Sequence, residues 1–167
     1  MSWMARGRYA LVLASVIILQ LGVFSDLRLG GVHPDVTLLI AVVAGLVAGP
    51  RRGGGIRFWA GLLIAPVLPT PLGMPGLVWA MVGFMAGMAE EMINSHTPLG
   101  LSLFVLGGSA GGSLLYAVVG QLFGAETLSG SDVGRIVGLI SATNALLALP
   151  TIAVVEWAEE SRSNITR

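Results

Sequence analysis

Side chains that could carry catalysis or hold a metal ion are few in this sequence, and their spacing suits neither task. Glu90 and Glu91 are adjacent, so they would project in different directions from a helix and not form a catalytic carboxylate pair. His33 and His96 fall on opposite faces of a membrane in the topology derived below, so they could not share an ion. The sequence contains no cysteine and no P-loop. We therefore expect no enzyme activity, no metal site and no cofactor.

Three polar residues stand next to or inside long apolar runs. Asn144 lies within an apolar run, where we expect a hydrogen bond between helices, worth about 1 kcal/mol or less. The alternative for Asn144 is a polar cavity or a contact with a partner protein. Gln121 lies near the end of the preceding run. Asp35 follows Pro34 directly before a third run and is suited to cap a helix N-terminus, with partner binding as a possible second role.

The overall composition is that of an integral membrane protein. Of the 167 residues, 54% are hydrophobic and 11% charged, whereas soluble domains carry about a quarter charged residues. The mean hydropathy is +0.85. The formal net charge is zero and the arginines are too dispersed to indicate nucleic-acid binding. The charges fall between long apolar runs, which is typical of membrane-spanning segments.

Six apolar segments predict an all-α bundle of about six transmembrane helices in one domain, 1–167. They cover residues 9–24, 36–49, 56–68, 77–93, 99–123 and 133–157. The last two reach the roughly 20 residues that a straight span needs. The second and third are shorter, which a nearly upright helix inside a bundle tolerates. A re-entrant hairpin is the alternative for these two, but Arg51 and Arg52 between them need water, which favours two short helices.

The distribution of arginines predicts the orientation. With all six segments crossing and the N-terminus inside, the inner side receives seven arginines and the outer side two. The inner ones are Arg6, Arg8, Arg51, Arg52, Arg57, Arg162 and Arg167, and the outer ones Arg28 and Arg135. We expect a multi-pass protein of the bacterial inner (cytoplasmic) membrane with both termini in the cytoplasm.

Glycines four residues apart recur within the apolar segments and predict close helix packing. Small residues at this spacing share one helix face and allow backbones to approach each other. The pairs include Gly45 and Gly49, Gly83 and Gly87, Gly134 and Gly138, and the cluster of Gly107, Gly108, Gly111 and Gly112. For this cluster we favour a tight crossing inside the bundle over a docking site for a partner helix.

The stretch from residue 33 to 88, about a third of the chain, resembles the rod shape-determining protein MreD family. The resemblance rests on the following motifs in their order: His33-Pro34-Asp35, a leucine-rich run, Pro50-Arg51-Arg52-Gly53, Gly61-Leu62-Leu63 and Leu72-Gly73. One departure is near Ala65, where the family frequently carries an aspartate at the end of the third span. A role for that carboxylate is therefore not carried over.

The resemblance implies a non-enzymatic scaffold of the machinery that elongates rod-shaped cells. Such a protein binds MreC and through it links the cytoskeletal MreB to the transpeptidase and glycosyltransferase of lateral peptidoglycan synthesis. We expect membrane lipid around it and no nucleic acid. Candidate partner-binding residues are Pro34, Asp35, Arg51, Arg52, Leu72, Gly73, Gly107, Gly108, Gly111 and Gly112.

The family's similarity in fold to the substrate-binding subunits of energy-coupling-factor transporters supplies the alternative function. Those subunits are likewise small six-helix membrane proteins. A substrate-binding subunit of a small-molecule transporter would need a polar cavity, for which Asn144, Gln121 and Asp35 are the candidate lining residues.

Overall fold

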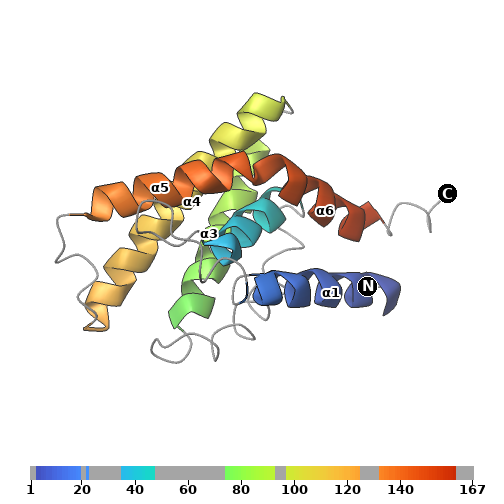
Figure 1. The fold of residues 1–167 in the computed structure, drawn as a ribbon, viewed down its shortest axis with the longest axis horizontal. Helices are drawn as coiled ribbons and strands as arrows, with labels where there is room; N and C mark the ends of the chain where they lie inside the picture. The colour runs from blue at the N-terminus through green and yellow to red at the C-terminus, as the bar shows by residue number, and fades with distance from the viewer. Residues whose placement is uncertain are drawn as a thin grey trace.

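The computed structural model describes residues 3–19, 22, 35–47, 74–92, 97–124 and 132–160, and within these it contains six α-helices (Figure 1). They are α1 Trp3–Leu19, an unlabelled helix Val36–Val47, α3 Met74–Met92, α4 Pro98–Leu122, α5 Val133–Leu146 and α6 Ala148–Glu160. The predicted all-α class is confirmed. The predicted segment 56–68 lies outside the described residues.

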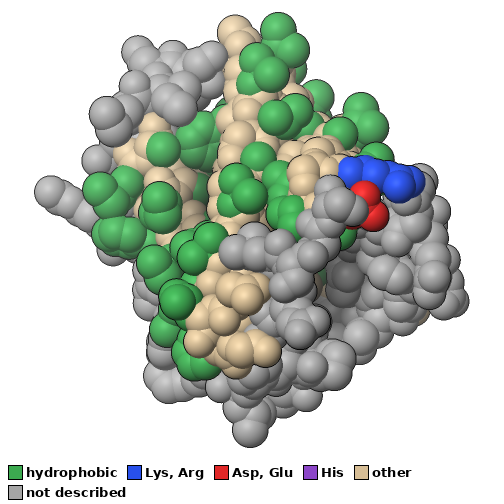
Figure 2. Space-filling view, turned by 90° about the vertical axis from the view of Figure 1, so that its left-hand side faces the viewer, with side chains coloured by type: hydrophobic (Ala, Val, Ile, Leu, Met, Phe, Trp, Pro, Cys, Tyr) green, Lys and Arg blue, Asp and Glu red, His purple; other side chains and the backbone are tan. Residues whose placement is uncertain are grey.

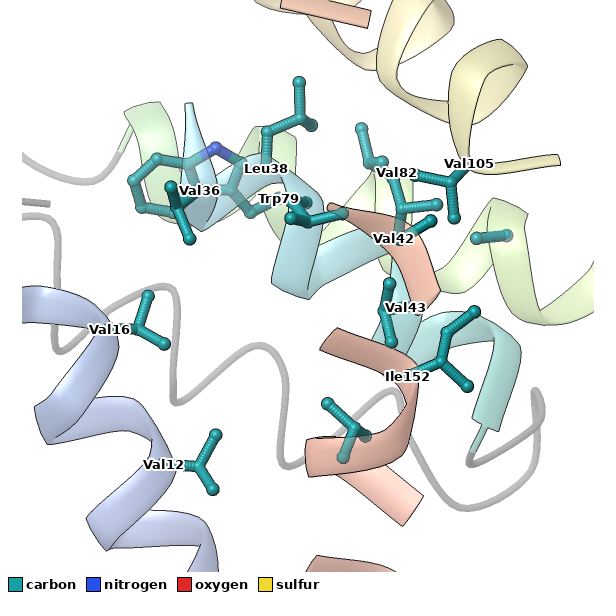
Figure 3. Close-up of a cluster of buried hydrophobic side chains, with 14 of the residues drawn as sticks. Val12, Val16, Val36, Leu38, Val42, Val43, Trp79, Val82, Val105 and Ile152 are labelled. Carbon is teal, nitrogen blue, oxygen red and sulfur yellow. The ribbon is translucent and has the colours of Figure 1, made fainter. Parts of the chain in front are cut away.

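The helix Val36–Val47, here called the central helix, lies in the middle of the described bundle (Figure 1). Its side chains Leu38, Leu39, Val42 and Val43 are buried. Figure 3 shows how the other helices contribute to the same core: valines come from α1, Trp79 and Val82 from α3, Val105 from α4 and Ile152 from α6. The central helix is therefore covered by this chain's own elements, and its apolar surface is used inside the bundle.

Close approach of the central helix to its two neighbours depends on glycine. A Cβ atom built on Gly45 would lie 2.6 Å from the Cβ of Ala86, 2.7 Å from the carbonyl oxygen of Gly83 and 3.2 Å from the nitrogen of Gly87. Gly83 and Gly87 are the predicted small-residue pair of α3, and both are buried. The expectation that glycines four apart allow backbones to approach is confirmed at this crossing.

On the same face, the central helix meets α4 just as closely. A Cβ on Gly108 would lie 2.8 Å from a methyl carbon of Val42, and one on Gly112 would lie 2.6 Å from a methyl carbon of Leu38. The central helix thus packs one face against both α3 and α4, with Gly45 at the first contact and Gly108 and Gly112 of α4 at the second. Side chains at these glycine positions would push the helices apart.

The apolar segment 133–157, expected as one span, forms two helices bent by 57°. The break falls at Leu147, and Pro150 explains its position. Proline has no N–H to donate to the carbonyl of Leu146, and its ring clashes with that carbonyl. The α5 helix closes with a bond from the Leu147 nitrogen to the Thr143 carbonyl oxygen at 3.1 Å. The next helix begins with a bond from the Thr151 nitrogen to the Leu147 carbonyl oxygen at 3.2 Å.

Among the described helices, α4 alone is long and apolar enough by itself to cross a membrane. The bent pair of α5 and α6 gives a second candidate if it is counted as one span. The predicted segment 99–123 agrees with α4, Pro98–Leu122, to within one residue. The first helix begins earlier than predicted, at Trp3 rather than residue 9.

The first and last helices lie side by side, with the start of α1 and the end of α6 on the same side of the molecule (Figure 1). The guanidinium of Arg8 lies over the Trp157 ring, 4.7 Å from its centroid. Arg8 Nη1 also donates a hydrogen bond of 3.4 Å to the carbonyl oxygen of Trp157. A cation over an indole ring is favourable, so this contact ties α1 to α6 near the two ends of the chain.

Candidate functional site

The four glycines of the 107–112 cluster divide into two pairs on different faces of α4. Gly108 and Gly112 face the central helix, as described above. A Cβ on Gly107 or Gly111 would meet no atom within 4 Å, and both residues are exposed. Half of the cluster is therefore used in packing inside the bundle, and the other half lies on an open surface.

Gly107 and Gly111 sit in the middle of a continuous apolar strip, which we call the outer face of α4. Exposed residues at intervals of three or four positions make up this strip: Leu99, Leu103, Gly107, Gly111, Leu114, Val118 and Leu122. The interval places them on one side of the helix. The two glycines form a shallow notch in a row of large side chains, a shape that would admit another helix closely.

Asn144 makes the hydrogen bond between helices that its position predicts. It is fully buried, and its Nδ2 donates to Ser109 Oγ of α4 at 3.0 Å. The bond joins α4 to α5 in the last turn of α5, directly before the bend. Sequence reasoning missed Ser109, although its position four residues before Ser113 in the middle of a long apolar run was an available signal.

Gln121 does not join Asn144. It lies twelve residues beyond Ser109 on α4, which corresponds to about 18 Å along the helix axis. Its position is exposed at the end of the helix. Asn144 and Gln121 therefore do not line one common cavity.

Asp35 is the N-terminal cap of the central helix, as predicted. Its Oδ1 accepts a hydrogen bond of 2.9 Å from the Leu38 nitrogen and a second one from the Thr37 hydroxyl. Burial raises the pKa of the Asp35 carboxyl, and the hydrogen bonds from Thr37 and Leu38 offset part of that increase. These bonds satisfy an otherwise unpaired donor of the first helical turn.

The remaining candidates, Pro34, Arg51, Arg52, Leu72 and Gly73, lie outside the described residues, as does Ala65. Within the described ranges, no group of three or more histidine, cysteine, aspartate or glutamate residues is placed to hold a metal ion.

Comparisons of this chain with protein-family models, with curated proteins and with solved structures found no match.

Proposed function

We propose that the chain is a multi-pass membrane protein that crosses the bilayer six times. The apolar outer face of α4 supports this proposal, because only 28% of the most apolar stretch of that helix is buried inside the molecule. Figure 2 shows hydrophobic side chains over much of the described surface on one side, with charged atoms gathered at an edge. In water, an exposed apolar surface of this extent would promote aggregation, whereas lipid would cover it.

The proposed orientation places both termini in the cytoplasm. The contact between Arg8 and Trp157 supports the part of this proposal that concerns the relative position of the ends, because it joins α1 to α6. The excess of arginines on the inner side of the six-span topology supports the choice of the cytoplasmic face. Tryptophan and arginine together are typical of the boundary between hydrocarbon and water.

Within that membrane setting, we propose that the protein is a non-enzymatic scaffold of the bacterial elongation machinery. In this role it binds MreC, and through MreC it links MreB filaments to lateral peptidoglycan synthesis. The resemblance of residues 33–88 to the MreD family motivates the proposal. The observation that carries it is the division of the α4 glycines, since Gly107 and Gly111 leave a notch in the outer face at which the membrane-spanning helix of MreC would dock.

A pair of double variants tests this docking. Gly107→Leu with Gly111→Leu fills the notch of the outer face without touching any described atom at the Cβ position. Gly134→Leu with Gly138→Leu is the matched control, because these glycines of α5 have the same spacing and equally open surroundings. Both double variants should be produced in a rod-shaped host that depends on this protein, together with affinity-tagged MreC.

We expect the α4 double variant to accumulate in the membrane, to lose MreC on co-purification and to give rounded cells. The α5 control should retain MreC and rod shape. If MreC never co-purifies with the unmodified protein and depletion leaves cells rod-shaped, the scaffold proposal is wrong. If MreC is retained equally by both double variants, the outer face of α4 is not the docking site.

A further inference from the structure

Buried polar side chains concentrate at one helix contact, that between α4 and α5. Among the described residues, the buried polar or charged ones are Thr37, Ser109, Ser141 and Asn144. Thr37 belongs to the Asp35 cap. Ser109 comes from α4, while Ser141 and Asn144 are three positions apart and so share one face of α5. The contact between α4 and α5 therefore carries a polar centre inside an apolar bundle.

Two oxygen atoms of this centre lack hydrogen-bond partners. Asn144 uses its Nδ2 to bond Ser109, but its buried Oδ1 has no partner. The Ser113 Oγ is also buried and unpaired. Ser113 follows Ser109 by one helical turn, so it shares the side of α4 on which Ser109 bonds Asn144 of α5. Rotating the Asn144 amide by half a turn would exchange its two ends and leave the nitrogen unpaired instead.

The hydroxyl of Ser141 also bears on which kind of group could form hydrogen bonds with these unpaired atoms. Ser141 donates its proton to the Val137 carbonyl oxygen at 2.7 Å, which leaves the Ser141 oxygen able to accept a bond. Of the atoms on Asn144, Ser141 and Ser113, Asn144 Oδ1 and Ser141 Oγ can accept a hydrogen bond and the Ser113 hydroxyl can donate one. A group that donates twice and accepts once would complete the set.

We propose that one water molecule binds between α4 and α5 and bridges Asn144, Ser113 and Ser141. Water donates its two protons to Asn144 Oδ1 and Ser141 Oγ and accepts the proton of the Ser113 hydroxyl. Buried waters typically make about three hydrogen bonds to polar groups that would otherwise be unpaired, which is the number proposed here. The site is independent of the partner of this protein and of its role in the cell.

A metal cation fits the centre less well. The available oxygens are all neutral, and an uncompensated charge in a low-dielectric interior is far more costly than a neutral ligand. Asn144 lies in the last turn of α5, so the bound water would hold the start of the bent segment against α4. The water would act as a polar lock beside the bend at Leu147.

The direction in which Ser113→Ala changes the melting temperature distinguishes a centre that contains water from a dry one. If water bridges Ser113 to α5, Ser113→Ala removes a made hydrogen bond and the melting temperature of the purified full chain should fall by about 2–4 °C. If the centre is dry, the same substitution removes a buried unpaired hydroxyl and the melting temperature should rise. Ser102→Ala, elsewhere on α4, is the matched control and should change little. A rise for Ser113→Ala overturns the proposal.

A crystal structure of the full chain in a lipid mesophase provides the direct readout. We expect density within hydrogen-bonding distance of both Asn144 Oδ1 and Ser113 Oγ, and its loss in Ser113→Ala crystals. Crystals soaked in thallium should show no anomalous signal at that position. A thallium signal, a direct bond between Ser113 and Asn144, or close contact without density would each overturn the water site.

Discussion

The helix α4 carries two glycine pairs within six residues. One pair packs against the central helix, and the other lies on an open surface. The inner pair is Gly108 and Gly112, and Cβ atoms at these positions would lie 2.8 and 2.6 Å from methyl groups of the central helix. The outer pair, Gly107 and Gly111, has nothing within 4 Å of the same positions. The pairs have the same spacing and are offset by one residue, which turns them by about 100° around the helix. The role of a small residue is therefore decided by what lies opposite, not by the spacing itself.

Among the packed glycines, substitution of Gly45 should cost the most stability, because Gly45 of the central helix lies against the backbone of α3. Gly45→Ala would place a methyl group 2.7 Å from the Gly83 carbonyl oxygen, and that oxygen cannot turn away as a side chain can. We expect a loss of about 3 kcal/mol in the free energy of unfolding, at the upper end of the usual effect of overpacking. Denaturant titration of the protein in detergent micelles would measure it.

Gly138→Ala on α5 is the control for that experiment, because its surroundings are open and it should not lose stability. Equal stability of Gly45→Ala and the unmodified protein would show that the central helix and α3 are not in close contact at Gly83. The contrast between packed and open glycines would then fail at its strongest point.

The inner pair of α4 should show a smaller loss, because flexible side chains oppose it. In Gly112→Ala the nearest atom is the end of Leu38, which can move, while two methyl carbons of Val82 lie at 3.2 and 3.3 Å. We expect a loss of about 1–2 kcal/mol in the free energy of unfolding. Shortening the opposing side chain with Leu38→Val should recover part of that loss. If Leu38→Val adds its own full cost in the Gly112→Ala background, the two positions are not in contact.

The sequence alone predicts that these glycines and Asn144 make contacts between helices, but not which atoms they meet. The spacing of Gly107 to Gly112 correctly indicated a tight crossing, but interleaved pairs with the same spacing cannot reveal which pair faces the bundle. That choice depends on where the central helix lies, and its position is set by side chains from four other helices. In the same way, Asn144 indicated a bond between helices, whereas its partner Ser109 lies 35 residues away and follows only from the tertiary arrangement.

Local signals were more informative where the cause is local. Asp35 caps the helix that begins one residue later, because the capping bond involves only neighbouring residues. The end of α5 was also readable in principle, since Pro150 removes a donor to Leu146 whatever surrounds it. The hydropathy of segment 133–157 nevertheless predicts one span, because the apolar run continues through the bend. Hydropathy records apolar length and carries no information about helix direction.

Substitution of Asp35 should destabilise the packed side of the molecule, because Asp35 caps the N-terminus of the central helix. Asp35→Ala loses the bond to the Leu38 nitrogen and should lower the free energy of unfolding by about 1 kcal/mol. Asp35→Asn keeps a capping oxygen and removes the charge that burial disfavours, so it should be as stable as the unmodified protein or more stable at neutral pH. Thermal unfolding in detergent would compare the three proteins.

The difference in stability between Asp35→Asn and the unmodified protein should depend on pH. Because the pKa of Asp35 is raised in the fold, the folded state binds its proton more tightly than the unfolded state does. The stability that this proton contributes is present below the usual range of an aspartate and is lost as the pH rises through the folded pKa. The stability advantage of Asp35→Asn should therefore appear as the pH rises through that range. An advantage that is constant with pH would contradict the raised pKa.

The smallest effect, with the opposite sign, is expected on the outer face. Gly107→Ala and Gly111→Ala add methyl groups where nothing lies within 4 Å, and alanine restricts the unfolded chain more than glycine does. We expect each to raise the free energy of unfolding of the purified protein by up to about 0.5–1 kcal/mol. The same alanines should instead weaken any helix that packs into the notch. If either variant loses stability as Gly112→Ala does, the outer face is covered by this chain or by a second copy in the purified protein.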